Sequence, residues 1–212
     1  KVRLDVPEPR LLNRTRIGNR MVVPTALTMP VIRSVWPFFM ALSRTMIRTA
    51  GLAGRTPAAA LLRANQLILN DSRAEMFLTA FYADLDTRSG RLAYARAGHN
   101  RPLWWHAGAG RLDELDADGI VLGAMDAIHL EERQIDVAPG DLVLLYTDGV
   151  TDAMDGAGRQ FGVERLQDAL AADPTAGAQQ VISTIVRAVG EFTGDTPQFD
   201  DLTLVAVKRS SP

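Results

Sequence analysis

A short apolar segment that ends in an acid constrains this 212-residue chain more than any other feature. In PGDLVLLYTDGVTD (residues 139–152), five apolar residues lie between a Pro-Gly pair and an Asp-Gly pair. A continuous apolar run of this length between turn signals predicts a strand that is covered on both faces. This strand must end at Thr147 or Asp148, and it therefore places a carboxylate at the rim of a buried sheet.

The carboxylate of Asp148 has two interpretations. Gly149 follows it and lets the backbone turn sharply, which suits an acid that ligates a hard cation. Asp-Gly is also a common turn dipeptide, and the segment taken alone favours this simpler interpretation.

A second acidic segment changes that balance. Asp200 and Asp201 stand side by side directly before another apolar run, in FDDLTLVAV (residues 199–207). Adjacent carboxylates repel each other unless a cation or hydrogen-bond donors neutralise them, so the pair indicates a site. Neighbouring residues of a strand point to opposite faces, and at most one of these two acids faces a given site directly.

Composition limits the chemistry that such a site can use. With 47% hydrophobic and 23% charged residues, the chain has the make-up of a soluble globular domain with one substantial core. The absence of cysteine excludes disulfides, zinc–thiolate sites and thiol nucleophiles, and three histidines argue against a multi-histidine metal site. Oxygen ligands for a hard cation remain available.

Charge is distributed unevenly along the chain. Residues 9–70 contain nine arginines and no acid, whereas residues 71–212 contain 23 acids and 12 basic residues. We interpret this split as complementarity within the molecule, and we expect no nucleic-acid partner because interleaved surface aromatics are lacking. Three prolines and Arg33 interrupt the apolar residues 21–42, so we expect no membrane span, and we expect a cytoplasmic location.

The periodicity of the apolar residues predicts the order of the elements. Helical spacing is found at residues 38–50 and, after Thr56 as N-cap and Pro57 as first helical residue, up to residue 70. Alternation predicts a hairpin of residues 76–85 and 91–97, joined by a turn at 86–90. Further strands are expected at 21–23, 31–36, 103–106, 111–115, 120–122 and 130–137, and further helices at 161–172 and 176–193. Strands flanked by helices at both ends favour an α+β sandwich.

The tetrad AGHN at residues 97–100 also has two interpretations. His99 and Asn100 could act as a general acid and a positioning amide near a phosphate. A Gly-His-Asn turn after a strand is more often a hydrogen-bonded corner, and the residues favour that structural role.

Six motifs in this order resemble the bacterial SpoIIE branch of the metal-dependent protein serine/threonine phosphatases, the PPM superfamily. They are MFLTAFYADLD (76–86), ARAGHNRPLWW (95–105), GIVLG (119–123), PGDLVLLYTDGVTDA (139–153), FGVERL (161–166) and FDDLTLVAVKR (199–209). The resemblance covers about two-thirds of the chain. It implies an α+β fold, a four-layer α/β/β/α sandwich of two antiparallel sheets flanked by helices. It also implies two divalent cations, Mn²⁺ or Mg²⁺, and a water that attacks phosphoserine or phosphothreonine.

The resemblance also implies roles for particular residues and a kind of partner. Asp148 and Asp200 would ligate the metal and carry catalysis, with supporting or accessory roles for Gly149, Asp152, Asp201, His99 and Asn100. The expected substrate is a phosphoprotein, such as an anti-sigma-factor antagonist-type regulator in a partner-switching pathway. An upstream sensory domain and a dimer are both compatible with this resemblance.

The first third of the chain departs from the family's pattern. The family places a Gly-Asp-x-x-Asp motif and an Asp-Val-x-Gly-x-Gly loop before the helix that begins near Phe38. Residues 9–70 contain no acid, and Arg33 stands where the second motif belongs. Two cations carry four positive charges, so Asp148 and Asp200 alone predict weaker metal binding than an intact site has. We therefore divide this single domain into an atypical, degenerate segment (1–37) and a SpoIIE-like phosphatase domain (38–212).

Three explanations of this departure remain open. In the first, the chain is a catalytically inactive pseudophosphatase that acts as a protein-binding regulatory module. In the second, it is an enzyme with a weaker one-metal site or an alternative site. The third explanation is that residues 1–37 arise from a shifted reading frame, which the nucleotide sequence upstream of the Phe38 codon would show.

Overall fold

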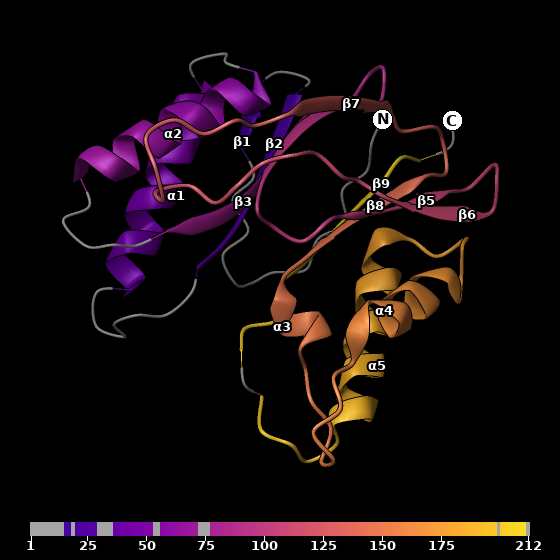
Figure 1. Cartoon of the computed structure of the whole chain (residues 1–212). Coiled ribbons are helices and arrows are strands. Elements are labelled where there is room, and N and C mark those ends of the chain that lie inside the picture. Colours follow the sequence, from indigo (N-terminus) through magenta and orange to yellow (C-terminus); the bar gives the residue numbers. More distant parts are fainter. Residues whose placement is uncertain are drawn as a thin grey trace. The chain divides into compact units, whose positions relative to one another are not determined.

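The computed structural model describes residues 15–17, 20–28, 36–52, 56–71, 77–198 and 200–210. These residues form two compact units, each built around one sheet with its own helices (Figure 1). The first unit contains residues 11–99 and 116–136, and the second contains residues 100–115 and 137–212.

The first unit has a five-stranded antiparallel sheet in the order β1-β2-β3-β4-β7. Its strands are β1 (Thr15–Ile17), β2 (Arg20–Thr28), β3 (Leu78–Asp86), β4 (Arg91–Ala97) and β7 (Glu132–Asp136). Helices α1 (Trp36–Leu52) and α2 (Pro57–Asp71) lie beside this sheet (Figure 1). Apolar side chains from both helices, including Ile47, Leu61 and Ile68, form one buried cluster with residues of β3 and β4.

Helix α2 begins at Pro57, where the Thr56-Pro57 pair predicts its start. Proline suits this position because its missing N–H would have no partner inside the helix. The Ala58 N–H donates to the carboxylate of Glu132 on β7, at 3.0 Å. A neighbouring strand thus satisfies one of the free donors of the first helical turn.

Strand β2 is longer than the sequence predicts. A three-residue strand at 21–23 is expected because Pro24 follows, but the pairing with β3 continues in register from Arg20 to Thr28. Strand β1 pairs only with Arg20, Met21 and Val22, so among the described residues Pro24 has a strand neighbour on one side only. A proline without an N–H is tolerated where a strand lacks a second neighbour.

The second unit has a four-stranded antiparallel sheet in the order β6-β5-β8-β9. Its strands are β5 (Leu103–His106), β6 (Arg111–Glu114), β8 (Leu142–Tyr146) and β9 (Leu204–Lys208), and its helices are α3 (Asp148–Thr151), α4 (Gly162–Ala171) and α5 (Ala178–Thr193). All five residues of β8 are buried, as the apolar run predicts. Val181, Ile185 and Val189 along α5 join the same apolar cluster as residues of β8.

Two antiparallel sheets flanked by helices confirm the predicted fold class. The hairpin of β3 and β4 is confirmed as well, and it closes through Gly90, whose φ is 85°. The strand expected at 120–122 is reduced to an isolated bridge between Leu122 and Leu78. Residues 31–35 of the strand expected at 31–36 lie outside the described residues, and Trp36 begins helix α1.

Within the described part of the chain, no helix is both long enough and apolar enough to cross a bilayer.

Candidate functional site

Asp148 lies two residues beyond strand β8, which ends one residue earlier than the sequence predicts. The strand ends at Tyr146, Thr147 has extended backbone angles (φ −99°, ψ 159°), and Asp148 is the first residue of the short helix α3. The Oδ1 atom of Asp148 is buried and has no hydrogen-bond partner among the described residues. A buried carboxylate oxygen without a donor is costly for the folded protein, which makes it a candidate ligand.

The segment that carries Asp200 and Asp201 docks on this strand end. Strand β9 pairs with β8, with Leu204 opposite Tyr146. Beyond that pair, the Thr147 N–H donates to the carbonyl of Thr203 at 3.1 Å. The Thr147 hydroxyl donates to the carbonyl of Asp201 at 3.1 Å and accepts from the Thr203 N–H at 3.0 Å. These bonds hold the two acid-bearing segments together.

Gly149 permits this close approach. A Cβ atom at position 149 would lie 2.4 Å from the carbonyl oxygen of Asp201 and 3.0 Å from its carbonyl carbon. Both are backbone atoms, which cannot rotate away as a flexible side chain can. The Asp-Gly pair is therefore more than a turn, because its glycine lets the 200–201 segment lie against Asp148.

The charges of two other acids act on Asp148. Burial, and next the negative charge of Asp200, raise the pKa of Asp148 above its ordinary value, and Asp152 adds to this effect. A nearby negative charge raises the pKa of a carboxyl group because it disfavours the ionised form. Asp200 and Asp152 therefore lie close enough to Asp148 to influence its protonation.

The remaining contacts of these acids are local. Asp200 is exposed, and its Oδ1 accepts the N–H of Asp201 at 2.7 Å. The side-chain amide of Gln198 donates to the carbonyl of Asp200 at 2.6 Å. Asp152 is also exposed and accepts from the side-chain amide of Gln160 at 3.2 Å. Asp201 contributes through its backbone N–H and carbonyl, and its side chain is exposed.

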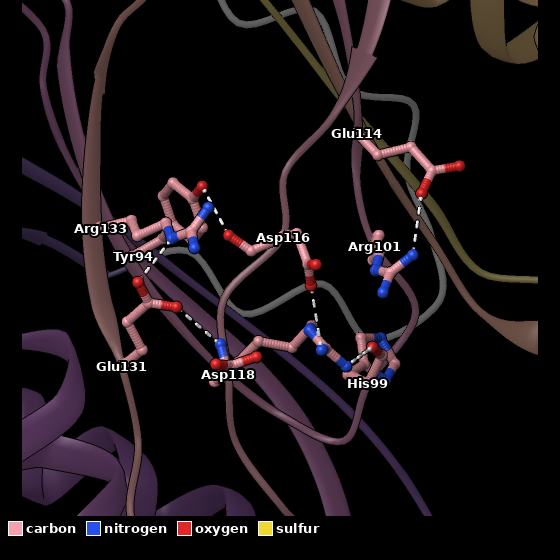
Figure 2. Close-up of polar contacts among 9 residues, drawn as sticks. Tyr94, His99, Arg101, Glu114, Asp116, Asp118, Glu131 and Arg133 are labelled. Carbon is pink, nitrogen blue, oxygen red and sulfur yellow. Dashed lines mark hydrogen bonds and ion pairs between the residues drawn. The ribbon is translucent and has the colours of Figure 1, made fainter.

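His99 lies in the first unit and has the surroundings of a structural corner (Figure 2). Its side chain is only 3% exposed, its Nδ1 lies 3.2 Å from the Thr79 hydroxyl, and its carbonyl accepts from Arg96 at 3.1 Å. Burial, and next the charge of Arg96, lower the pKa of His99 to about 4. A neutral imidazole is a poor general acid near neutral pH. Asn100 is half-buried and belongs to the second unit.

A polar network around this corner was not predicted (Figure 2). Arg96 pairs with the carboxylate of Asp116 at 3.1 Å, and the Tyr94 hydroxyl donates to the Asp116 carbonyl at 3.0 Å. Farther along, Arg133 pairs with Glu131 at 2.7 Å. No local pattern in the sequence indicates these partners, because Arg96 and Asp116 are 20 residues apart.

The donor set fits a hard divalent cation. Carboxylate oxygens are the ligands that Mg²⁺ and Mn²⁺ prefer, and a cation at Asp148 would relieve its repulsion with Asp200. Among the residues that the structure describes, no three or more His, Cys, Asp or Glu side chains are grouped so that they could hold a metal ion. The described acids therefore do not by themselves supply a two-cation centre.

One family profile and several known proteins match this chain. The sequence profile of the SpoIIE family, described as Stage II sporulation protein E, matches residues 38–210. Protein IcfG of Synechocystis sp. is 33% identical over 135 residues, which cover 64% of this chain and 21% of that protein. Phosphoserine phosphatase RsbU of Bacillus subtilis is 27% identical over 158 residues, which cover 74% of this chain and 46% of that protein. The chain therefore spans less than half the length of these two relatives.

Solved structures share the fold. The SiaA-PP2C domain of Pseudomonas aeruginosa superposes with a TM-score of 0.80 at 23% identity, covering 92% of this chain and 78% of that one. RsbX in complex with magnesium gives a TM-score of 0.66 at 14% identity, covering 91% of this chain and 83% of that one. The family match over most of the chain and the shared fold agree, and this chain belongs to the SpoIIE family.

Proposed function

We propose that this chain is a protein phosphatase domain that hydrolyses phosphoserine or phosphothreonine on a regulatory protein. One observation carries the proposal: a buried oxygen of Asp148, just beyond the end of β8, lacks a hydrogen-bond partner among the described residues, and the negative charge of Asp200 raises the pKa of the same acid. The name of RsbU, a phosphoserine phosphatase that this chain matches over 158 residues, supports it.

In this proposal, Asp148 and Asp200 hold a divalent cation, Mg²⁺ or Mn²⁺. The magnesium in the RsbX structure supports this choice. When bound, the cation would polarise the phosphoryl group and lower the pKa of a nearby water. Asp148 itself must be ionised to bind the cation, so protons compete with the metal at its carboxylate. The raised pKa of Asp148 moves that competition to a higher pH than for an ordinary aspartate.

We keep one alternative, a regulatory module that binds a phosphoprotein without cleaving it. The observation behind it is that the described residues do not supply the acids of a two-cation centre. Residues 9–70, where the family's other metal motifs belong, contain no acid. A single weakly held cation would neutralise phosphate charge for binding but would activate water less well.

Hydrolysis of a phosphoserine peptide distinguishes the two functions. We expect the wild-type chain to cleave the peptide in the presence of Mn²⁺, and we expect Asp148→Asn to lower the rate by about a hundredfold or more. Asp168→Asn, a change of an exposed acid on α4 in the same unit, is the matched control and should keep the wild-type rate. Equal background rates in the wild type and Asp148→Asn would support the binding module instead.

We further propose a cytoplasmic substrate, a serine-phosphorylated regulator of the anti-sigma-factor antagonist type. This proposal follows from the family resemblance and from the exposed position of Asp200, which a phosphate carried on a folded partner can reach. Loss of phosphate from such a regulator, measured by mass spectrometry with wild-type chain and with Asp148→Asn, tests it. Cleavage of free phosphoserine at the same rate would contradict a protein substrate.

A further inference from the structure

Thr147 occupies a special place between the two acidic segments. The residue is 2% exposed, and its backbone N–H and its hydroxyl together make three hydrogen bonds, one to Asp201 and two to Thr203. These bonds span 54 to 56 residues of sequence. The hydroxyl acts in both directions, since it donates to the Asp201 carbonyl and accepts from the Thr203 N–H.

The peptide groups of Asp201 connect this hydroxyl to the carboxylate of Asp200. The Asp201 carbonyl accepts from Thr147, while the Asp201 N–H donates to Asp200 Oδ1 at 2.7 Å. The backbone of Asp201 is therefore hydrogen-bonded both to Thr147 and to the side chain of Asp200. Thr147 is also joined to Asp148 by a peptide bond. A single residue therefore contacts both segments that carry the candidate ligands Asp148 and Asp200.

The hydroxyl is the part of Thr147 that no apolar side chain can replace. Valine has the same branched shape, but it would leave the Thr203 N–H and the Asp201 carbonyl without the bonds that the hydroxyl makes. Both groups could then regain partners only by moving away from the β8 end. Serine lacks the methyl group of threonine but keeps the donor and the acceptor.

We propose that Thr147 is a positioning residue for the cation site, whose hydroxyl holds the Asp200 segment where Asp148 and Asp200 bind the same cation. This inference rests on the proposed function, because it takes these two acids as the cation's ligands. Under this inference, Thr147 contributes to the affinity for the metal as well as to the stability of the fold.

Titration calorimetry with Mn²⁺ tests the inference without measuring catalysis. We expect Thr147→Val to raise the dissociation constant for Mn²⁺ by about tenfold or more. The dissociation constant of Thr147→Ser should stay within about threefold of the wild-type value. Val189→Ala, a change to a buried residue of α5, serves as a control that lowers stability away from the acids. It should bind Mn²⁺ as the wild type does at a temperature well below its unfolding transition. If Thr147→Val does not fold, Thr147→Cys replaces it, since a thiol is a weak donor and acceptor.

A second comparison separates positioning from general loosening of the site. In an Asp200→Asn background, Thr147→Val should weaken the remaining Mn²⁺ binding by less than about twofold, because the residue that it positions no longer binds the metal. Equal Mn²⁺ affinity in the wild type and Thr147→Val, or equal losses in both backgrounds, overturns the inference and leaves the proposed function standing. Failure of the wild-type chain to bind Mn²⁺ overturns the proposed function and, with it, this inference.

Discussion

At the scale of single residues, Gly149 shows how a common dipeptide acquires a specific role. The Asp-Gly pair is a frequent turn signal, and its sequence alone favours that interpretation. In the structure, the space where a side chain would begin is filled by the backbone of Asp201. Contact with a distant segment therefore requires glycine at position 149. The same contact brings Asp200 close enough to Asp148 to influence its charge.

Substituting Gly149 therefore separates a steric requirement from a turn preference. We expect Gly149→Ala to lower the free energy of unfolding by about 1–3 kcal/mol, because Asp201 must move to accept the methyl group. Mn²⁺ affinity should fall with it. Urea denaturation measures the first effect and calorimetry the second.

Gly190 provides the matched control for this substitution. It lies inside helix α5, and a Cβ built there meets no heavy atom within 4 Å. Gly190→Ala should therefore be neutral or stabilising by up to about 1 kcal/mol, since alanine favours the helix. A loss of stability in Gly190→Ala equal to that in Gly149→Ala would contradict the steric explanation.

At the scale of elements, a buried amide attaches helix α2 to the loop after residue 122. The side chain of Asn65 is 1% exposed, accepts the Gly123 N–H at 2.7 Å and donates to the Met125 carbonyl at 3.0 Å. The same loop is bound to β3 by two bonds between Leu78 and Leu122, at 2.8 and 2.9 Å. One polar residue on an otherwise apolar helix face therefore fixes a loop that has little regular structure.

Removal of this amide tests its importance for the first unit. We expect Asn65→Ala to lower the free energy of unfolding by about 2–3 kcal/mol, because two backbone groups lose their side-chain partner in a buried place. Asn70→Ala, at an exposed position near the end of α2, should change stability by less than about 0.5 kcal/mol. Urea denaturation of both variants makes the comparison, and equal effects would show that Asn65 acts only through helix propensity.

The elements also show which parts of the fold are visible in the sequence. The apolar run of β8 and the alternation of β3 and β4 are local patterns, and both were predicted. Strand β2 was underestimated because Pro24 argues against a strand unless its neighbours are known. The site divides in the same way. Asp148 follows one visible strand and Asp200 precedes another, whereas the role of Thr147 depends on partners 54 to 56 residues away.

At the scale of the whole molecule, protonation couples stability to pH. The pKa of His99 is lowered to about 4 by burial and by Arg96, so the unfolded chain binds a proton there more readily than the folded protein does. Stability from this residue is complete above about pH 6.5, the ordinary value, and is lost as the pH falls towards 4. Asp148 acts in the opposite direction, because its raised pKa favours the folded state as its carboxylate becomes protonated.

We expect the effect of His99 to dominate, because its imidazole is almost completely buried and Asp148 is partly exposed. The metal-free protein should lose up to about 3 kcal/mol of unfolding free energy between pH 6.5 and pH 4.5. His99→Asn keeps an acceptor for the Thr79 hydroxyl but cannot titrate in this range, and it should show a smaller loss. Denaturant unfolding at the two pH values provides the measurement. An equal loss in the variant would assign the dependence to other groups.

The docking of β9 on β8 has a consequence for biosynthesis. While a ribosome is still adding residues 152–199, the nascent polypeptide already contains Asp148 but has no partner for it. Asp200 and the residues of β9 must emerge before they can pair with the end of β8. In the proposed cation site, binding by both acids would then require translation to pass this point, and prematurely terminated products would lack one of the two acids.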